Sequence, residues 1–237
     1  MKTLITQILK ETNPQMNSYF VSLKDGTFSK DDFVETQIQF HFAVVFFSRP
    51  MAAAAAKIPE AKLRLEVIRN VWEEHGEGNP SLIHGNTFLT FLDRLAGVNL
   101  EDIAVRSMWP EVRAFNTILV GACVMDEYLV GISVLGVIER MFSEISGWIG
   151  ESIVNRGWIP IERLIHYNLH ADLDIKHADD FFEVLRPAWE AEIENRYYIE
   201  QGLRLGVFIF NRLYEDLYDA RERRIFRDVR GPHTRAS

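Results

Sequence analysis

Two histidines and an aspartate recur at helical spacing in the stretch His170-Ala-Asp-Leu-Asp174-Ile-Lys-His177. Since these three residues stand at positions i, i+4 and i+7, their side chains project from one face of a helix. Two imidazoles and a carboxylate are donors that suit iron, manganese or zinc. His166 and Arg163 extend the same stripe backwards along the chain. The alternative interpretation is a solvated polar face that happens to contain histidines.

A second group of acidic residues lies shortly before His84. Glu77 and His84 are seven residues apart and would share a helix face, unless Pro80 resets the geometry. Glu74 is the rival carboxylate in the same segment. Acidic side chains are mostly exposed, so a solvated surface is the competing interpretation here. The choice between Glu74 and Glu77 therefore stays open.

The third candidate is a lone carboxylate in one of the most apolar stretches of the chain. Glu139 lies in Val134-Leu-Gly-Val-Ile-Glu139-Arg-Met-Phe. A buried unpaired charge costs several kcal/mol, so such a group must be paired, protonated or bound to a metal. Arg140 is adjacent, but it points about 100° away around the helix. A surface position for Glu139 is the alternative.

Helices must position all of these residues. Apolar residues recur at helical spacing almost everywhere, and no stretch alternates convincingly like a strand. Ser29 opens a predicted helix that ends at Pro50, and Pro59 opens another that reaches about Glu74. Further helices are predicted over residues 80–95, over 110–155 with a break near 126, over 161–178 and over 188–220.

Length, charge and cysteine content restrict the class of protein. A chain of 237 residues can bury one core, so a single domain is expected over 1–220, with a basic, flexible tail over 221–237. The net charge of -8 argues against a broad nucleic-acid footprint. Two acidic residues interrupt the most apolar region, 115–138, which argues against a membrane span. A lone cysteine and the absence of a signal-peptide pattern favour a cytoplasmic location.

Together the three signals form a recognisable order. A Glu and a His are followed about fifty-five residues later by a lone Glu, and about thirty further on by His-x3-Asp-x2-His. This layout, from about residue 70 to 180, resembles the heme-oxygenase-like diiron oxidases. That group includes CADD-like proteins and relatives that fragment fatty acids, cleave amino acids or hydroxylate guanidines. The resemblance implies an all-α, heme-oxygenase-like (TenA- and PqqC-like) bundle of about seven helices.

The resemblance also implies a metal centre with two Fe(II) ions, with manganese as the alternative metal and no organic cofactor. Glu139 and Asp174 would be its catalytic carboxylates. Three carboxylates and three neutral imidazoles around two Fe(II) leave one net positive charge and open coordination positions, which O2 and a substrate need. The implied ligands are Glu77 (or Glu74), His84, Glu139, His170, Asp174 and His177.

The implied function is that of a non-heme diiron oxidase or oxygenase. It would activate O2 on a small organic substrate of the fatty-acid or amino-acid type, and Arg163 could pair with a substrate carboxylate. O2 and this small molecule are the expected partners. No nucleic acid or membrane is expected, and a homodimer is left open.

Two other functions fit the same fold, because fold alone does not settle function. A TenA-type thiaminase needs a cysteine nucleophile, and Cys123 is the only candidate. Its surroundings, Leu119-Val-Gly-Ala-Cys-Val-Met, look like small-residue helix packing, where a buried thiol is inert. A non-catalytic binding protein would leave the inward acids and histidines without a purpose. His41, the only early histidine that could bind heme, is assigned to packing.

Overall fold

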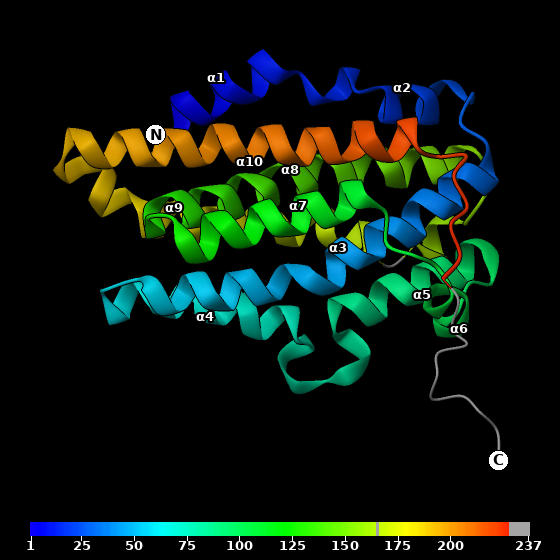
Figure 1. Ribbon diagram of the computed structural model, residues 1–237, viewed down its shortest axis with the longest axis horizontal. Helices are drawn as coiled ribbons and strands as arrows, with labels where there is room; N and C mark the ends of the chain where they lie inside the picture. The colour runs from blue at the N-terminus through cyan, green and yellow to red at the C-terminus, as the bar shows by residue number, and fades with distance from the viewer. Residues whose placement is uncertain (165, 228–237) are drawn as a thin grey trace.

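The computed structural model describes residues 1–164 and 166–227, without the side chains of 168–173. Within these residues ten α-helices and five short helical turns carry the fold, and no β-strand is present, as the sequence predicts (Figure 1). The α-helices are α1 (Lys2–Thr12), α2 (Ser18–Asp25), α3 (Lys30–Lys57), α4 (Ala61–Glu74), α5 (His84–Ala96), α6 (Leu100–Ala104), α7 (Pro110–Val120), α8 (Tyr128–Asn155), α9 (His166–Ala191) and α10 (Ile193–Asp219). The turns are η1 (Pro14–Met16), η2 (Gly76–Gly78), η3 (Pro80–Leu82), η4 (Gly121–Met125) and η5 (Ile161–Arg163).

The expected count of about seven helices is wrong, since the described residues contain ten. Three of the additional helices, α1, α2 and α6, have only 11, 8 and 5 residues. Such short segments span too few turns for apolar periodicity to separate a helix from a loop. Local signals define them instead: the side chains of Asn99 and Asp102 form a capping box at the start of α6.

Prolines end fewer helices than the sequence predicts. α3 continues through Pro50 to Lys57, and α9 continues through Pro187 to Ala191. A proline inside a helix removes one backbone hydrogen bond, but it need not stop the helix. Pro50 is followed closely by the run Ala52–Ala56, and alanine has the highest helix propensity. Favourable residues after the proline therefore sustain α3.

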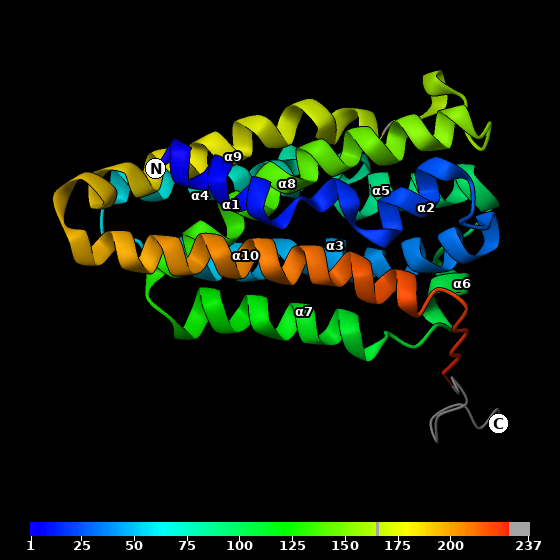
Figure 2. The same ribbon diagram turned by 90° about the horizontal axis from the view of Figure 1, so that it is seen from above.

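α8 is the central helix of the bundle and packs most extensively against α9 and α10. Figure 2 shows α7 along one edge of the molecule and α9 along the opposite edge, with α3 and α10 between them. A Cβ atom on Gly136 of α8 would lie 2.8 Å from Cβ of Phe181 on α9. This close approach brings Glu139, one turn further along α8, next to α9. Among the described helices, even α8 falls short of what a membrane span requires.

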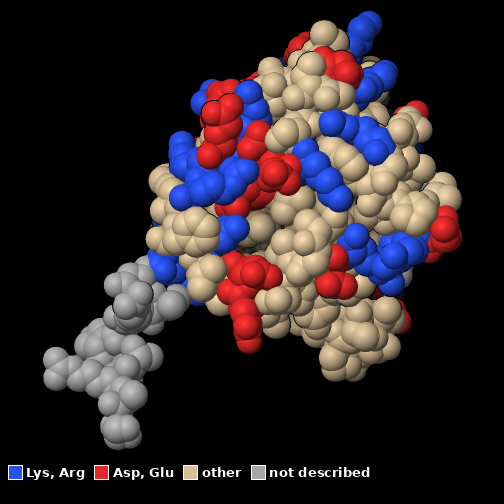
Figure 3. Space-filling view, turned by 90° about the vertical axis from the view of Figure 1, so that its right-hand side faces the viewer, with Lys and Arg blue, Asp and Glu red and all other residues tan. Residues whose placement is uncertain are grey.

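The first residues of the expected tail contact the body of the protein. The amide of Ser107 donates to the carbonyl of Ile225 at 2.9 Å, and Arg224 pairs with Asp32 at 2.8 Å. On this end of the molecule, Lys and Arg side chains are interspersed with Asp and Glu (Figure 3). The remainder of the tail, 228–237, lies outside the described residues.

Candidate metal centre

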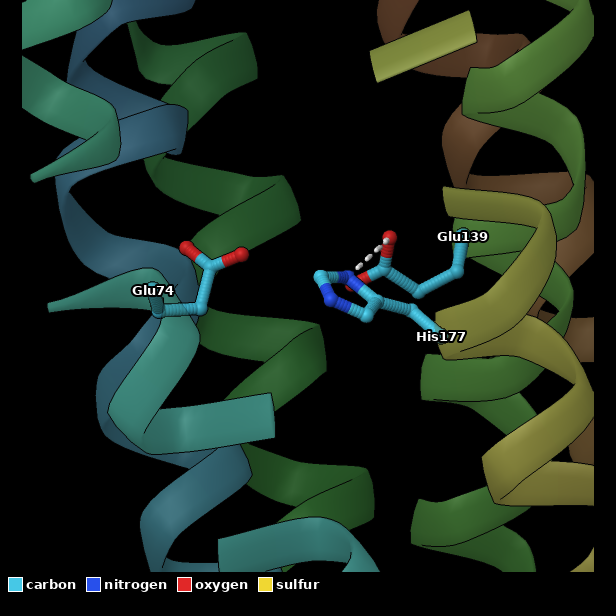
Figure 4. Close-up of side chains that lie close together, drawn as sticks. All are labelled: Glu74, Glu139 and His177. Atoms are coloured by element: carbon cyan, nitrogen blue, oxygen red, sulfur yellow. Dashed lines mark ion pairs between the residues drawn. The ribbon is translucent and has the colours of Figure 1, made fainter. Parts of the chain in front are cut away.

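Buried acidic and histidine side chains face one another between two walls of helices. Glu74 extends from α4, while Glu139 and His177 extend from α8 and α9 on the opposite side (Figure 4). One ligand atom from each of the three lies within 4.8 Å of the others. Asp174, one turn before His177 on α9, is also fully buried. A cation between the two walls would be within reach of Glu74, Glu139 and His177.

On the α8/α9 wall, the donors come from the middle of long helices. Nδ1 of His177 lies 3.9 Å from Oε2 of Glu139 and 3.9 Å from Oδ1 of Asp174. Two donors that bind one ion at about 2.1 Å lie about 3 to 4 Å apart, so this spacing suits a shared metal. Arg140 does not neutralise Glu139, because it pairs with Glu144 at 2.8 Å on the outer side of α8.

On the α4/α5 wall, the donors flank a tight turn. Glu74 is the last residue of α4 and His84 the first of α5, and Oε1 of Glu74 lies 2.7 Å from Nδ1 of His84. Gly76 makes this turn with a φ of 66°, and a Cβ there would lie 2.7 Å from the backbone nitrogen of Ile83. Only glycine fits without strain at such a position. The turn thus brings together two residues that are ten positions apart.

The turn also separates the two carboxylates that the sequence left open. Glu74 is buried beside His84, whereas Glu77 is exposed within η2 and has a φ of 52°. The predicted shared helix face of Glu77 and His84 is therefore wrong, because the helix ends before Glu77. His84, Glu139, Asp174 and His177 lie together with Glu74. The side chain of His170 lies outside the described residues.

Arg163 is not placed as the sequence predicted. α9 begins at His166 rather than at residue 161, because Leu164 has non-helical backbone angles (φ -86°, ψ 84°) between η5 and α9. Arg163 is therefore exposed on a separate turn, where its backbone carbonyl accepts a hydrogen bond from Arg94 at 2.7 Å. It does not continue the stripe of Asp174 and His177.

Two residues at the site were not singled out as functional from the sequence. His166 is buried, and its Nδ1 lies 3.0 Å from Oγ1 of Thr87. Its position four residues before His170 was a usable signal. Glu73 accepts a hydrogen bond from Nε2 of His177 at 2.6 Å. No sequence signal distinguishes it from its acidic neighbour Glu74.

The electrostatics of the site favour a bound cation. Burial, together with the charges of Asp174 and Glu74, raises the pKa of Glu139 well above its ordinary value. Burial lowers the pKa of His84, but the adjacent Glu74 and the more distant Asp174 outweigh it, so the net shift is upward. Oε1 of Glu139 and Nδ1 of His177 are buried without a hydrogen-bond partner in the described part of the chain. Such atoms call for an explanation, and a divalent metal fits this donor set.

Two cavities meet at Glu74 and His84. One is apolar and measures about 50 Å³, which is room for several water-sized groups. The other has a mixed polar and apolar lining, measures about 280 Å³ and includes His41, Arg49 and His75 in that lining. Neither lining includes Cys123 or Arg163. The apolar cavity is lined by Glu74, His84, Glu139, His166, Phe40, Ala43, Val44, Phe47, Phe115, Ile138, Phe142 and Phe210.

Comparison with known families agrees with this geometry. Residues 34–209 match the sequence profile of a family described as iron-containing redox enzyme. This segment is most of the chain and contains every candidate ligand. The protein belongs to the iron-containing redox enzyme family. The sequence resemblance stated above is thereby confirmed, although no curated protein matches the chain.

Solved structures of low sequence identity share the fold of this redox-family protein. A TenA homologue from Pseudomonas syringae pv. tomato is 16% identical, with a TM-score of 0.74 and 92% of each chain covered. A heme-oxygenase-like domain from Shewanella denitrificans is 14% identical, with a TM-score of 0.71 and coverage of 93% of this chain and 90% of that one. A CADD-like protein from Nostoc punctiforme is also 14% identical, with a TM-score of 0.70 and coverage of 91% and 97%. The fold is heme-oxygenase-like, and these identities show the fold alone.

Proposed function

We propose that this protein is a non-heme diiron oxidase that uses O2 to oxidise a small organic substrate. The observation that carries the proposal is the convergence of three buried carboxylates, Glu74, Glu139 and Asp174, in a member of an iron-containing redox family. A proton can neutralise one buried carboxylate, but several in contact repel one another unless cations lie between them. Two Fe(II) ions would satisfy this need, and Mn(II) is the alternative.

The two walls would divide the task of holding the metal. Glu74 and His84 would bind from the α4/α5 side, and Glu139, Asp174 and His177 from the α8/α9 side. His170 is proposed as the sixth ligand on the strength of its sequence spacing alone. When bound, Fe(II) would supply the electrons that convert O2 into an oxidant. The protein's part would be to supply the carboxylates, to hold His177 with Nδ1 inward and to exclude bulk water.

The apolar cavity supports a substrate with a compact apolar group. Phe40, Phe142 and Phe210 line it beside Glu139, so an alkyl or aromatic group would lie against the proposed metal ligands. Aromatic walls also keep water from competing for an oxidant. The small volume favours a short chain over a long one.

The larger cavity, which is lined in part by charged and polar side chains, supports a carboxylate on that substrate, as in a fatty acid or an amino acid. It shares Val44, Glu74 and His84 with the apolar cavity, and the guanidinium-bearing Arg49 is part of its lining. Arginine binds carboxylates through two parallel hydrogen bonds. We therefore assign to Arg49 the role that the sequence analysis gave to Arg163. In steady-state kinetics, Arg49→Gln should raise KM by about tenfold for one lost charged contact. An increase in Arg163→Gln alone would reverse the assignment.

The thiaminase alternative rests on Cys123, and two observations weaken it. The thiol is fully buried, and burial raises its pKa to about 12, so it is not a thiolate at neutral pH. Cys123 also lines neither cavity at the candidate centre. Cys123→Ala should leave iron-dependent O2 consumption unchanged. A non-catalytic binding protein is the remaining alternative, and it predicts no O2 consumption at all.

The test of the proposed function is anaerobic loading with Fe(II), followed by addition of O2 and a panel of short fatty acids and amino acids. The expected result is O2 consumption that depends on iron and on one substrate class, with an oxidised product detected by mass spectrometry. Glu139→Gln is the inactive control. If the iron-loaded protein consumes no O2 above the rate of free Fe(II) with any member of the panel, the oxidase function is wrong.

A further inference from the structure

We infer that Glu73 is a positioning residue that presents Nδ1 of His177 to the metal. The inference rests on the proposed function only for its premise that His177 binds a metal. Glu73 itself does not line either cavity at the centre. Glu73 instead contacts Nε2 of the His177 imidazole, on the side of the ring away from Nδ1.

The hydrogen bonds of Glu73 define the state of the imidazole. Oε2 of Glu73 lies 2.6 Å from Nε2 of His177. A carboxylate only accepts hydrogen bonds, so Nε2 must carry the proton. In the neutral ring Nδ1 is then bare, with a lone pair available for a metal. The Glu73 contact thus selects the one neutral tautomer that can bind a cation through Nδ1.

The direction of the bare nitrogen agrees with this role. Nδ1 of His177 lies 3.9 Å from an oxygen of Glu139 and 3.9 Å from an oxygen of Asp174, and it has no hydrogen-bond partner in the described part of the chain. The side chain of His177 is fully buried, so water does not replace the missing partner from bulk solvent. A ring that bonds a carboxylate on one edge and faces two carboxylates on the other is arranged as a metal ligand.

Glu73 is itself held in place from outside the site. Nζ of Lys176 lies 3.0 Å from Oε1 of Glu73, which leaves Oε2 for His177. Lys176 and His177 are neighbours on α9, whereas Glu73 belongs to the last turn of α4. The three side chains therefore connect the two walls of the site. Adjacent residues of α4 divide two roles: Glu74 faces the metal position, and Glu73 orients a ligand from the other wall.

Removal of the acceptor should weaken metal binding without removing a ligand. Partners of metal-bound histidines are worth about 10- to 100-fold in metal affinity. We expect Glu73→Ala to raise the dissociation constant for Mn(II), measured anaerobically by calorimetry, by about that factor. Glu73→Gln keeps an amide oxygen that can accept from Nε2, so it should restore most of the affinity. Glu66→Ala is the matched control, since Glu66 is also on α4 and forms an ion pair with Arg69 three residues further along that helix.

A second measurement separates orientation from general stability. In the metal-free wild type, the ¹⁵N NMR signals of His177 should show a protonated Nε2 and a bare Nδ1. Glu73→Ala should lose this preference, and Glu73→Gln should retain it. Thermal unfolding of the metal-free variants establishes that each one folds. Lys176→Ala should have an intermediate effect on metal affinity, because it loosens Glu73 without removing it.

The outcomes separate this inference from the proposed function. Wild-type Mn(II) affinity in Glu73→Ala, or an unchanged ¹⁵N pattern in that variant, would overturn the positioning role. If the wild type binds metal, Glu73→Ala binds it weakly and no substrate promotes O2 consumption, the oxidase function fails while the positioning role stands. A wild type that binds no metal would overturn both.

Discussion

The two walls of the candidate centre are built in different ways. On the α8/α9 wall, Glu139, Asp174 and His177 project from the interiors of two long helices that pack closely along their length. On the α4/α5 wall, Glu74 and His84 stand at the end of one helix and the start of the next, on either side of a strained turn. Helix packing positions the residues of the α8/α9 wall, whereas a tight turn positions those of the α4/α5 wall.

This difference indicates which wall is fixed and which can adjust. A helix interior has its backbone hydrogen bonds satisfied, and its side chains move only if the helix moves. The ends of helices leave backbone groups unpaired, and the turn here contains three residues with positive φ, Gly76, Glu77 and Gly78. We therefore expect the loss of a proposed ligand from the α8/α9 wall to weaken metal binding more than the loss of one from the α4/α5 wall.

The largest effect is expected from Glu139→Gln. This change removes a proposed central ligand of the α8/α9 wall, so Fe(II) affinity measured by anaerobic dialysis should fall more than about 100-fold. The metal-free variant should instead be more stable than the wild type in urea, because a buried carboxylate beside Asp174 and Glu74 is replaced by a neutral amide.

The gain in stability of metal-free Glu139→Gln over the wild type should depend on pH, and the direction of that dependence follows from the pKa of Glu139. Since the folded-state pKa of Glu139 is raised above 4.5, its contribution to stability is complete at low pH and is lost as pH rises through the folded pKa. The gain in Glu139→Gln should therefore grow with pH. Glu144→Gln is the control, as it breaks only a surface ion pair with Arg140 worth at most about 1 kcal/mol. A metal-free Glu139→Gln that is less stable than the wild type at high pH would refute the assignment.

The second prediction concerns the α4/α5 wall and the two carboxylates that the sequence did not separate. Glu74→Gln should weaken Fe(II) binding by about 10- to 100-fold, since it alters both a proposed ligand and the partner of His84. Glu77→Gln should leave the affinity unchanged, because Glu77 is exposed. Anaerobic titration of both variants measures this. The opposite ranking would place the carboxylate ligand at Glu77.

The third prediction tests the close packing behind the α8/α9 wall. Gly136→Ala would place a Cβ 2.8 Å from Cβ of Phe181, and overpacking of this kind costs about 1 to 3 kcal/mol of unfolding free energy. Gly147→Ala, also in α8, meets no atom within 4 Å and should stabilise the protein by up to about 1 kcal/mol. Urea unfolding distinguishes the pair. Equal shifts would show that α8 and α9 can separate without cost.

At neutral pH, the smallest effect is expected from a histidine outside the proposed ligand set. Burial lowers the pKa of His41 to about 4 from its ordinary 6.5. Because the unfolded chain takes up this proton first, stability falls as pH falls from 6.5 toward 4, by at most about 1.4 kcal/mol per pH unit. His41→Phe should remove this part of the acid sensitivity in thermal unfolding scans. An unchanged pH dependence would mean that His41 is protonated in the folded protein.

The difference between the two walls also explains how much of the candidate site the sequence could predict. Within one helix, spacing fixes which side chains share a face, so Asp174 and His177 could be grouped from the sequence alone. Burial of Glu139 followed from its apolar neighbours. Spacing does not carry across a turn, so Glu74 could not be chosen over Glu77 before the φ of Gly76 was known.

Other details depended on tertiary contacts that leave no local pattern. Arg163 was placed on the ligand stripe because the sequence did not show that the helix begins only at His166. The role of Glu73 depends on α4 meeting α9, and nothing near Glu73 in the sequence indicates that contact. The all-α fold was predictable because helical periodicity is distributed over the whole chain, whereas the short helices were not.

The central claim is that side chains from both walls bind iron between them. Equilibrium dialysis of the protein against Fe(II) without oxygen, followed by metal analysis, tests it most directly when wild type, Glu74→Gln and Glu139→Gln are compared. We predict two Fe(II) per wild-type chain and a loss of iron in each variant, larger for Glu139→Gln. Binding of less than one iron per wild-type chain, or equal binding in all three proteins, would contradict the account.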